Sequence, residues 1–427
     1  MEEKRNVPKL RFPGFTDPWE QRRLGELMDI TSVKRVHQDD WSSEGIRFLR
    51  ARDLVAFSNG EEIDEPLFIS EELYEEYSSL SGKAVENDLL VTGVGTIGVP
   101  WRVPSSEPIY FKDGNIIWFK NMNVIDGLFF YYSFTSSSIQ DFIRKSAGSG
   151  TVGTFTIDTG KKTPIQLPSI DEQAQIGGFF QRLDSLIALH QRELDHVKEL
   201  KKGLLQKMFP KEGTNVPELR FPGFTDPWEQ RRLGDEFEFL RNNTLSRAEL
   251  SDSEGSCFDV HYGDVLIKFG SVIDLEKMAL PRIASDKMAS RLTCDKLRNG
   301  DVVVADTAED EAAGKCVELR KIGDATVYPG LHTMPLRPLR RYAPGFLGHY
   351  LNSSSFRDQL KPLMQGIKVI SVSRAVIAGT SLIVPAIDEQ DAIAKTFAKL
   401  DSLIALHQRE LDHVKELKKG LLQQMFV

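Results

Sequence analysis

Two long stretches of the chain place their apolar residues at spacings of three and four. In the first stretch these are Leu183, Leu186, Ile187, Leu194, Val197, Leu200, Leu204 and Met208. The spacing predicts one apolar stripe on an α-helix, with charges of both signs on the other faces. No proline interrupts residues 171–209, and Pro168 followed by Asp171 and Glu172 is typical of a helix start. We therefore predict a helix over 170–209, about 58 Å long for about 39 residues.

The same helical stretch occurs twice. The letters from Leu183 to Gln206 return unchanged from Leu400 to Gln423 and predict a second helix over 387–427. One such helix cannot bury its stripe alone, so we predict that the two copies pack on each other as a pseudo-symmetric pair. The alternative, that each helix packs only on its own globular part, stays open. The residues predicted to pair the helices are Leu183, Leu186, Ile187, Leu194, Val197, Leu200 and Leu204 with Leu400, Leu403, Ile404, Leu411, Val414, Leu417 and Leu421.

A second repeat precedes each half. "VPKLRFPGFTDPWEQRRLGE" at 7–26 returns as "VPELRFPGFTDPWEQRRLGD" at 216–235. Asp17 as N-cap, Pro18 at the first helical position and Glu20 predict a short helix here. Trp19 and its copy are predicted to be packing anchors, because large aromatic residues mostly serve cores.

The segments between the repeats differ in the two halves. Glycine-punctuated β-rich runs such as "DLLVTGVGTIGVPWRV", "IRFLRARDLV", "GDVLIKFGSVIDL" and "GDVVVADTAED" predict strands, and helical pieces such as "FFYYSFTSSSIQDFIRK" follow. Each half is therefore predicted to be a mixed α/β domain followed by a long helix. We expect domains at 1–169 and 216–386, helices at 170–209 and 387–427, and a linker at 210–215.

Composition adds little to this picture. The chain has 427 residues, 41% of them hydrophobic and 27% charged, as in ordinary soluble proteins. No apolar run is long enough for a membrane span, and "MEEKRNVPKL" is not a secretory signal. Three cysteines, Cys257, Cys294 and Cys316, favour a reduced cytoplasmic setting and are predicted to be buried thiols. The net charge of −8 weighs against nucleic-acid binding, although local positive charge matters more than the sum.

No motif predicts catalysis or a metal site. "GVGTIG" at 93–98 fits a dinucleotide fingerprint, but Pro100 and the continuing strand favour a glycine-rich strand turn. "GTFTIDTGKKT" has the wrong spacing for a phosphate loop. The histidines of the repeated helices are predicted to be surface or seam residues: His190, His196, His407 and His413. A recognition module is favoured over an enzyme.

Basic and small polar residues in the variable segments are the candidate nucleic-acid contacts. Arginines on strands or loops can read base edges, and Gly/Ser loops flanked by cations suit phosphate. The candidates are Lys34, Arg35, Arg47, Arg50, Arg52, Arg102, Arg144, Lys145, Ser149 and Thr151 in the first half, and Lys268, Ser271, Lys361, Lys368 and Ser371 in the second.

The whole pattern resembles a type I restriction–modification specificity subunit. The resemblance rests on the "WEQRRLGE" and "WEQRRLGD" openings, the strand patterns "IRFLRARDL" and "NDLLVTGVGTIG", and the helix entries at "IDEQ", in this order and twice. The second half departs from it, with "GDVVVADTAEDEAAGK" in place of the glycine-rich strand. The resemblance implies an α+β fold in which two target-recognition domains are separated by two long antiparallel coiled-coil helices with pseudo-twofold symmetry.

The resemblance also implies a function. Each domain would read one half of a bipartite, asymmetric site on double-stranded DNA, with the helices as spacer. Two methyltransferase subunits and restriction/translocase subunits would dock on the helices and carry S-adenosylmethionine, ATP and Mg, so that no cofactor binds this chain. Two alternatives stay open: a duplicated DNA-binding regulator acting without enzymes, and a coiled-coil scaffold joining two proteins.

Overall fold

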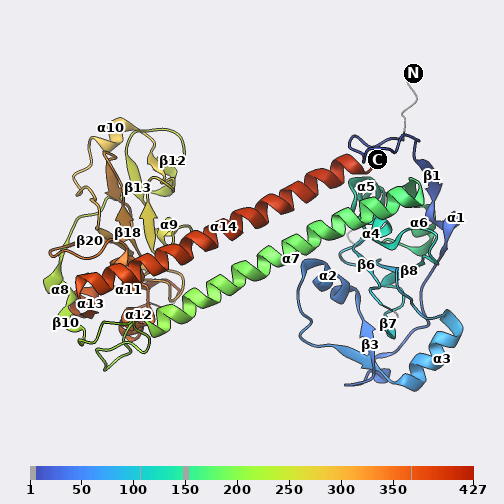
Figure 1. Cartoon of the computed structure of the whole chain (residues 1–427), viewed down its shortest axis with the longest axis horizontal. Helices are drawn as coiled ribbons and strands as arrows, with labels where there is room; N and C mark the ends of the chain where they lie inside the picture. Colours follow the sequence, from blue (N-terminus) through green and yellow to red (C-terminus); the bar gives the residue numbers. More distant parts are fainter. Residues whose placement is uncertain (1–5, 106, 148–152, 367) are drawn as a thin grey trace. The chain divides into compact units, whose positions relative to one another are not determined.

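The computed structural model describes residues 6–105, 107–147, 153–366 and 368–427, and the chain forms two compact units (Figure 1). The first unit comprises Met1–His190 and Glu410–Val427, and the second comprises Gln191–Arg409. Each unit therefore holds one variable segment together with parts of both long helices. The mixed helix-and-strand fold with two long helices confirms the predicted fold class.

Two sheets form the variable part of the first unit. The larger has the order β2-β8-β5-β6 and is antiparallel throughout, and the smaller has the order β4-β3-β7 with β3 and β7 parallel. The strands are β2 (Asp29–Thr31), β3 (Ile46–Leu49), β4 (Leu67–Ile69), β5 (Leu89–Thr92), β6 (Pro100–Arg102), β7 (Ile109–Phe111) and β8 (Ile116–Lys120).

Six shorter helices accompany these sheets in the described part of the first unit. They are α1 (Leu24–Leu27), α2 (Ala51–Asn59), α3 (Glu71–Ser81), α4 (Gly127–Thr135), α5 (Ser137–Ser146) and α6 (Ile157–Lys162). The apolar helix α4 buries Phe129, Phe130 and Phe134 completely, and Phe134 packs edge-on against Phe119 of β8. This contact fixes α4 and α5 against one face of the larger sheet.

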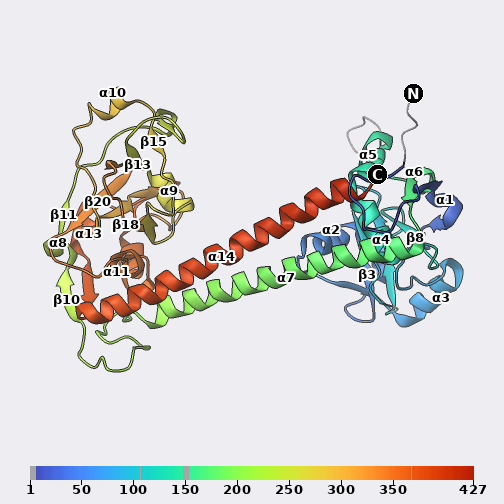
Figure 2. The ribbon, with the colours of Figure 1, turned by 45° about the horizontal axis from the view of Figure 1, so that its top comes forward.

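The second unit repeats this plan with one more strand in each sheet. Its larger sheet has the order β11-β20-β16-β18-β14, and its smaller sheet has the order β12-β15-β13-β19 with β13 and β19 parallel (Figure 2). The strands are β11 (Phe237–Phe239), β12 (Leu250–Ser251), β13 (Phe258–Val260), β14 (Val272–Asp274), β15 (Arg282–Ile283), β16 (Val302–Ala305), β18 (Cys316–Arg320), β19 (Val327–Pro329) and β20 (Thr333–Pro338). The helices are α8 (Leu233–Glu236), α9 (Tyr262–Ile267), α10 (Asp286–Ala289), α11 (Phe346–Leu351), α12 (Ser354–Leu360) and α13 (Arg374–Gly379).

The strand registers show which residues of the two units correspond. Leu89 pairs with Phe119 and Arg102 in the first unit, and Val302 pairs with Leu336 and Glu318 in the second. β5, β8 and β6 thus correspond to β16, β20 and β18. β14 forms the edge of the larger sheet in the second unit. In the described part of the first unit, the larger sheet has no strand that corresponds to β14.

Two sequence predictions fail inside the variable segments. "IRFLRARDLV" forms a strand only as far as Leu49, because Asp53 receives the backbone N–H of Arg50 at 2.8 Å and caps α2. "GDVLI", predicted as strand, forms α9, where the side chain of His261 accepts the N–H of Gly263. Capping by a side chain overrides the β-propensity of these short apolar runs.

The borders of each domain are strands instead of the predicted short helix. β1 (Glu20–Arg23) pairs with β9 (Pro164–Leu167), and β10 (Glu229–Arg232) pairs with β22 (Ser381–Val384) in the same antiparallel register. The predicted helix at "TDPWE" is wrong because the segment finds a partner strand far along the chain. Trp19 and Trp228 are both 2% exposed, which confirms them as packing anchors.

The long helices are α7 (Ile170–Lys207) and α14 (Ile387–Met425), so both predicted helices are confirmed and α7 begins at the predicted residue. In the first unit the beginning of α7 lies antiparallel to the end of α14, with Lys418 Nζ 2.5 Å from Asp184. In the second unit Lys201 Nζ lies 2.5 Å from Asp401. Asp184 and Asp401 are copies of one repeat position, and Lys201 and Lys418 are copies of another. The same aspartate–lysine contact therefore joins the helices in both units.

The covered stripe of each helix repeats every 3.5 residues. In α7 it comprises Leu183, Ile187, His190, Leu194, Val197, Lys201, Leu204 and Met208. A 3.5-residue period is that of a coiled-coil seam. The prediction is wrong for Leu186, Leu200, Leu403 and Leu417, which are 42–45% exposed, because the seam takes a histidine and a lysine instead of leucines. Leu183, Leu194, Leu400 and Leu411 are buried, and Ile187, Val197, Leu204, Ile404, Val414 and Leu421 are half-buried.

The helix ends complete the core of each unit. Phe209, just after α7, is 1% exposed and stacks on Phe397 and against Trp228 in the second unit. Phe426, just after α14, packs in the same way against Trp19 and Phe129 in the first unit. Each variable domain is thus closed by the end of the long helix that follows the other domain.

Candidate nucleic-acid interface

A loop site lies at one end of the larger sheet in the first unit. The β5–β6 turn contains "GVGTIG", and the backbone N–H of Phe155 donates to the carbonyl of Gly93 at 2.9 Å. A β-carbon on Gly98, whose φ is +77°, would lie 3.1 Å from Ile143 of α5. The motif is therefore a strand turn, as predicted, and the structure joins it to the segment after α5.

The second unit has the same site with different residues. The backbone N–H of Val372 donates to the backbone carbonyl of Asp306 at 2.8 Å, and β17 (Thr307–Ala308) pairs with β21 (Ile370–Ser371). Asp306, His332 and Ser371 line a cavity of about 190 Å³ at this place. Two motifs that the sequence presents separately thus form one loop site in each unit.

Several predicted contacts lie at these loop sites. Arg144 and Lys145 occupy the last turn of α5, and Arg144, 67% exposed, pairs with Asp141. In the second unit Lys361 lies 2.8 Å from Asp358, while Lys368 and Ser371 are exposed. Ser149 and Thr151 lie outside the described residues. As nucleic-acid contacts these residues stay predictions.

A second group of candidates surrounds the smaller sheet of the first unit. Lys34 lies 3.6 Å from Glu76, and Arg35, 67% exposed, donates to Asp113. Arg47 lies over the ring of Phe68. Arg52 is 64% exposed on the first turn of α2. Arg35 and Arg52 are largely exposed, whereas Lys34 is 42% exposed and Arg47 is half-buried.

Arg50 and Arg102 are engaged inside the fold. Arg50 is only 14% exposed and makes two side-chain hydrogen bonds to Asp53, at 2.9 and 3.0 Å. Arg102 donates to Asn87 at 2.8 Å and is half-buried. The structure gives both arginines a packing role. Arg50 is the N-cap residue of α2 and Arg52 lies in that helix, instead of in the predicted strand.

The two candidates around the glycine of "IKFGS" differ in exposure. Lys268 is exposed and lies 5.8 Å from the centre of the Phe269 ring. Ser271 is 8% exposed, and its carbonyl accepts the backbone N–H of Glu318 at 3.0 Å. Ser271 therefore lies just before the edge strand β14 and is held against β18.

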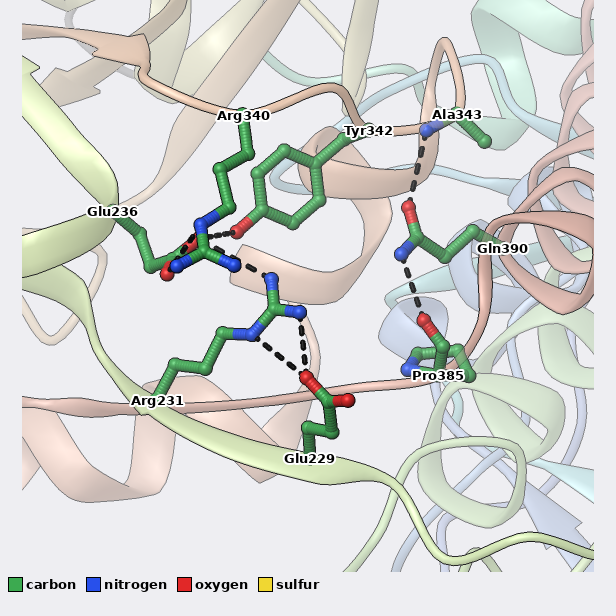
Figure 3. Close-up of polar contacts among 8 residues, drawn as sticks. All are labelled: Glu229, Arg231, Glu236, Arg340, Tyr342, Ala343, Pro385 and Gln390. Carbon is green, nitrogen blue, oxygen red and sulfur yellow. Dashed lines mark hydrogen bonds and ion pairs between the residues drawn. The ribbon is translucent and has the colours of Figure 1, made fainter.

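A polar network joins the repeated border to the variable sheet in the second unit (Figure 3). Arg231 lies 2.6 Å from Glu229 and 3.3 Å from Glu236, whose carboxylate also accepts the hydroxyl of Tyr342 at 2.8 Å. Arg340 reaches the same Glu236 at 3.3 Å. Burial, followed by the hydrogen bond to Glu236, raises the pKa of Tyr342 well above its usual range, so this phenol stays protonated.

The border also makes contacts that are the same in both units. Arg11 Nε lies 2.7 Å from Glu172, and Arg220 Nε lies 2.7 Å from Glu389, each in a two-bond pair with a buried carboxylate. Such paired arginine–carboxylate bonds fix geometry strongly. The repeats thus hold different domains in one scaffold.

One seam position differs between the units. Tyr132 donates to Asp184 at 2.6 Å in the first unit. At the corresponding place in the second unit His349 Nε2 lies 3.7 Å from Asp401. His349 is 1% exposed, and burial lowers its pKa to about 3, so its ring is neutral.

The cysteines are only partly as predicted. Cys316 is buried, and its burial raises its pKa to about 12. Cys257 and Cys294 are half-buried, so the prediction of burial is wrong for these two. Across the described part of the chain, no helix combines the length and apolar content that a membrane crossing requires.

The molecule defined by these features has two different domains of similar topology, each held by nearly identical borders and by long helices that share a repeated stretch. Residues 16–199 match the family model of the type I restriction modification DNA specificity domain. The type I restriction enzyme MjaVIII specificity subunit of Methanocaldococcus jannaschii is 21% identical over 308 residues, covering 70% of this chain and 69% of the relative.

Solved structures agree with this match at the level of the fold. The type I restriction-modification S subunit from M. genitalium has a TM-score of 0.60 at 14% identity, covering 99% of both chains. A second solved structure concerns the complex assembly and conformational transition of a type I R-M system. Its chain has a TM-score of 0.54 at 16% identity, and the match covers 98% of this chain and 99% of that chain. The family match lies in the first half of the chain, and the solved structures share the fold of the whole chain.

Proposed function

We propose that the chain is a specificity subunit of a type I restriction–modification system and that each unit reads one half of a bipartite, asymmetric DNA site. The observation that carries the proposal is the pair of loop sites. They occupy the same end of corresponding sheets in the two units but present different residues, and the borders that hold them are nearly identical. A scaffold that keeps its borders and changes only its loops is suited to reading two different sequences. The exposed cations around these loops supply phosphate contacts despite the acidic total.

We also propose that the helices dock two copies of one partner. Leu186 and Leu189 are 43% and 41% exposed on α7, and their copies Leu403 and Leu406 are 42% and 41% exposed on α14. Exposed leucines that recur with equal exposure in two places favour a partner that binds twice. The family assigns this place to methyltransferase subunits, with restriction/translocase subunits joining the complex.

The chemistry of the complex is proposed to reside on those partners. The chain itself would be non-catalytic, and S-adenosylmethionine, ATP and Mg would be held by the methyltransferase and restriction subunits. Such a complex would act in the cytoplasm, on double-stranded DNA.

A domain exchange tests the proposal. Residues 27–169 are replaced by the corresponding domain of a relative, and the methylated sites of the resulting complex are mapped. One half of the target is expected to change, because β1 and α7 lie outside the exchanged segment and the new domain supplies a strand in place of β9. The reciprocal replacement of 236–386 is the matched control and should change only the other half. Alteration of both half-sites by one exchange would exclude independent reading.

A further inference from the structure

A cavity of about 470 Å³ opens at one end of the larger sheet in the second unit. Its walls come from the residues before β16, the end of β18 and the segment that joins β20 to α11. Leu319, Pro338, Pro344 and Leu347 give it apolar walls. This volume lies within the range of about 300–1,000 Å³ that is typical of small-molecule sites.

Four basic side chains and one carboxylate line the cavity. Lys321 is engaged by Glu276 at 2.7 Å, and Arg340 contacts Glu236 at 3.3 Å. Arg320 and Arg341 also line it, and within the described residues neither makes a side-chain hydrogen bond or ion pair. The carboxylate, Glu318, is already engaged by the N–H groups of Gly345 and Gly348. The cavity therefore presents two guanidinium groups whose donors are unused.

The cations are specific to the second unit. By strand register, Arg320 corresponds to Pro104 of the first unit, and Arg340 and Arg341 correspond to Asn123 and Val124. None of these three positions of the first unit is charged. A cationic cavity present once is not part of the duplicated surface that would serve two copies of one partner.

The cavity is also separate from the loop site of its own unit. Gly300 lines the cavity just before β16, whereas Asp306 lines the loop site just after that strand. The four residues of β16 span about 13 Å at 3.3 Å per residue. The two sites therefore lie at opposite ends of the sheet.

We propose that this cavity binds a phosphate-bearing anion of about nucleotide size. Two free guanidinium groups offer about ten N–H donors, more than one carboxylate can accept, and their planar fork matches phosphate oxygens. The apolar walls suit the remainder of such a ligand. The phosphate comes either from a free nucleotide or from the backbone of DNA, and the two sources are separable by experiment.

The first arm of the test uses free ligands. The full chain is titrated calorimetrically with inorganic pyrophosphate, with ADP and with adenosine, which lacks phosphate. Pyrophosphate and ADP are expected to bind at one site per chain and adenosine not to bind. The double variant Arg320→Gln/Arg341→Gln should weaken binding by about tenfold or more, as two charge-assisted contacts are lost.

A matched variant controls for net charge. Lys287→Gln/Arg291→Gln removes two exposed charges of the same unit outside the cavity and should leave pyrophosphate binding within about twofold. An equal loss in both double variants, or the absence of saturable binding of pyrophosphate, ADP and DNA, would overturn the proposal.

The second arm distinguishes the sources. If the phosphate belongs to DNA, a short duplex displaces pyrophosphate, and the Arg320→Gln/Arg341→Gln variant lowers the salt slope of DNA binding by about two. If it belongs to a free nucleotide, DNA binding keeps its salt slope while pyrophosphate binding is lost. Methylation-site mapping of the variant complex reports the reading of the half-sites separately, so failure here leaves the proposed function standing.

Discussion

Arg50 illustrates how a residue that suits base reading by type can be required by the fold instead. Its guanidinium and backbone N–H both bind Asp53, whose side chain is 3% exposed. Arg50→Ala would leave that buried carboxylate with only the longer ion pair to the exposed Arg52, at 3.9 Å, and we expect a cost of about 3 kcal/mol. We expect chemical denaturation to show this loss in the first unit. Arg52→Ala, at 64% exposure, is the control and should cost less than about 0.5 kcal/mol.

The stability of Arg50→Ala separates a packing role from base reading. If the variant keeps wild-type stability and instead accepts a changed base at one position, Arg50 reads DNA and the packing assignment is wrong.

Glu318 makes the stability of the second unit depend on pH. Its burial raises its pKa to about 7 from 4.5, despite the N–H groups that it accepts. The folded state therefore binds a proton more readily than the unfolded state, and the contribution of Glu318 to stability falls as pH rises from about 4.5 to about 7.

The test compares urea unfolding of wild type and Glu318→Gln between pH 4.5 and 8. The difference between their free energies of unfolding is expected to change by up to about 3 kcal/mol over this window, since one pKa unit is about 1.4 kcal/mol. Tyr342→Phe removes a different buried polar group and should give a difference that does not follow this pH window. A Glu318→Gln difference that is constant with pH would contradict the raised pKa.

At the scale of elements, each variable domain is closed by the end of the long helix that follows the other domain. Phe209→Ala removes a fully buried ring from the second unit, and such losses cost about 3–5 kcal/mol. Hydrogen exchange should show faster exchange in β16 and β20 while β5 and β8 stay protected.

Phe426→Ala is the matched variant at the corresponding repeat position. Its ring packs on Trp19, Phe129 and Phe180, so the loss of protection should appear in the first unit instead. Loss of protection in the same unit for both variants would show that the helix ends do not close the domains as described.

The elements also show which features the sequence could predict. Long apolar periodicity with acidic first turns predicts α7 and α14, because the signal lies within one continuous segment. β1 was out of reach, since its partner β9 lies more than 140 residues away and only that pairing makes "EQRR" a strand. Leu186 was misassigned because a stripe read at spacings of three and four does not separate the 3.5-residue seam, with His190 and Lys201, from its flank.

The loop site of the first unit was predictable only in parts, because it also depends on contacts between distant segments of the chain. "GVGTIG" and the Gly/Ser loop were both recognisable, but their union depends on the contact of Phe155 with Gly93. Arg320 and Arg341 come from different segments, and only the register of β16, β18 and β20 brings them to one cavity. The adjacent pairs Arg320–Lys321 and Arg340–Arg341 were the local signals of this cavity in the sequence.

At the scale of the whole molecule, the proposed function makes helix length a determinant of the DNA target. α7 and α14 each contribute to both units. The two helices are joined by the ion pair of Asp184 with Lys418 in the first unit and by that of Lys201 with Asp401 in the second. A seven-residue insertion keeps the 3.5-residue seam in phase, provided that both helices receive it at the same repeat position.

Inserting one heptad after Gln191 and another after Gln408 lengthens each helix by about 10.5 Å at 1.5 Å per residue. DNA rises about 3.4 Å per base pair, so the gap between the half-sites should grow by about three base pairs while both half-site sequences stay unchanged. Methylation-site mapping measures the gap directly. The control is a heptad inserted in α7 alone, which puts the two helices out of register and should abolish the complex. An active complex that carries both insertions and methylates sites with the original gap would show that helix length does not set the spacing.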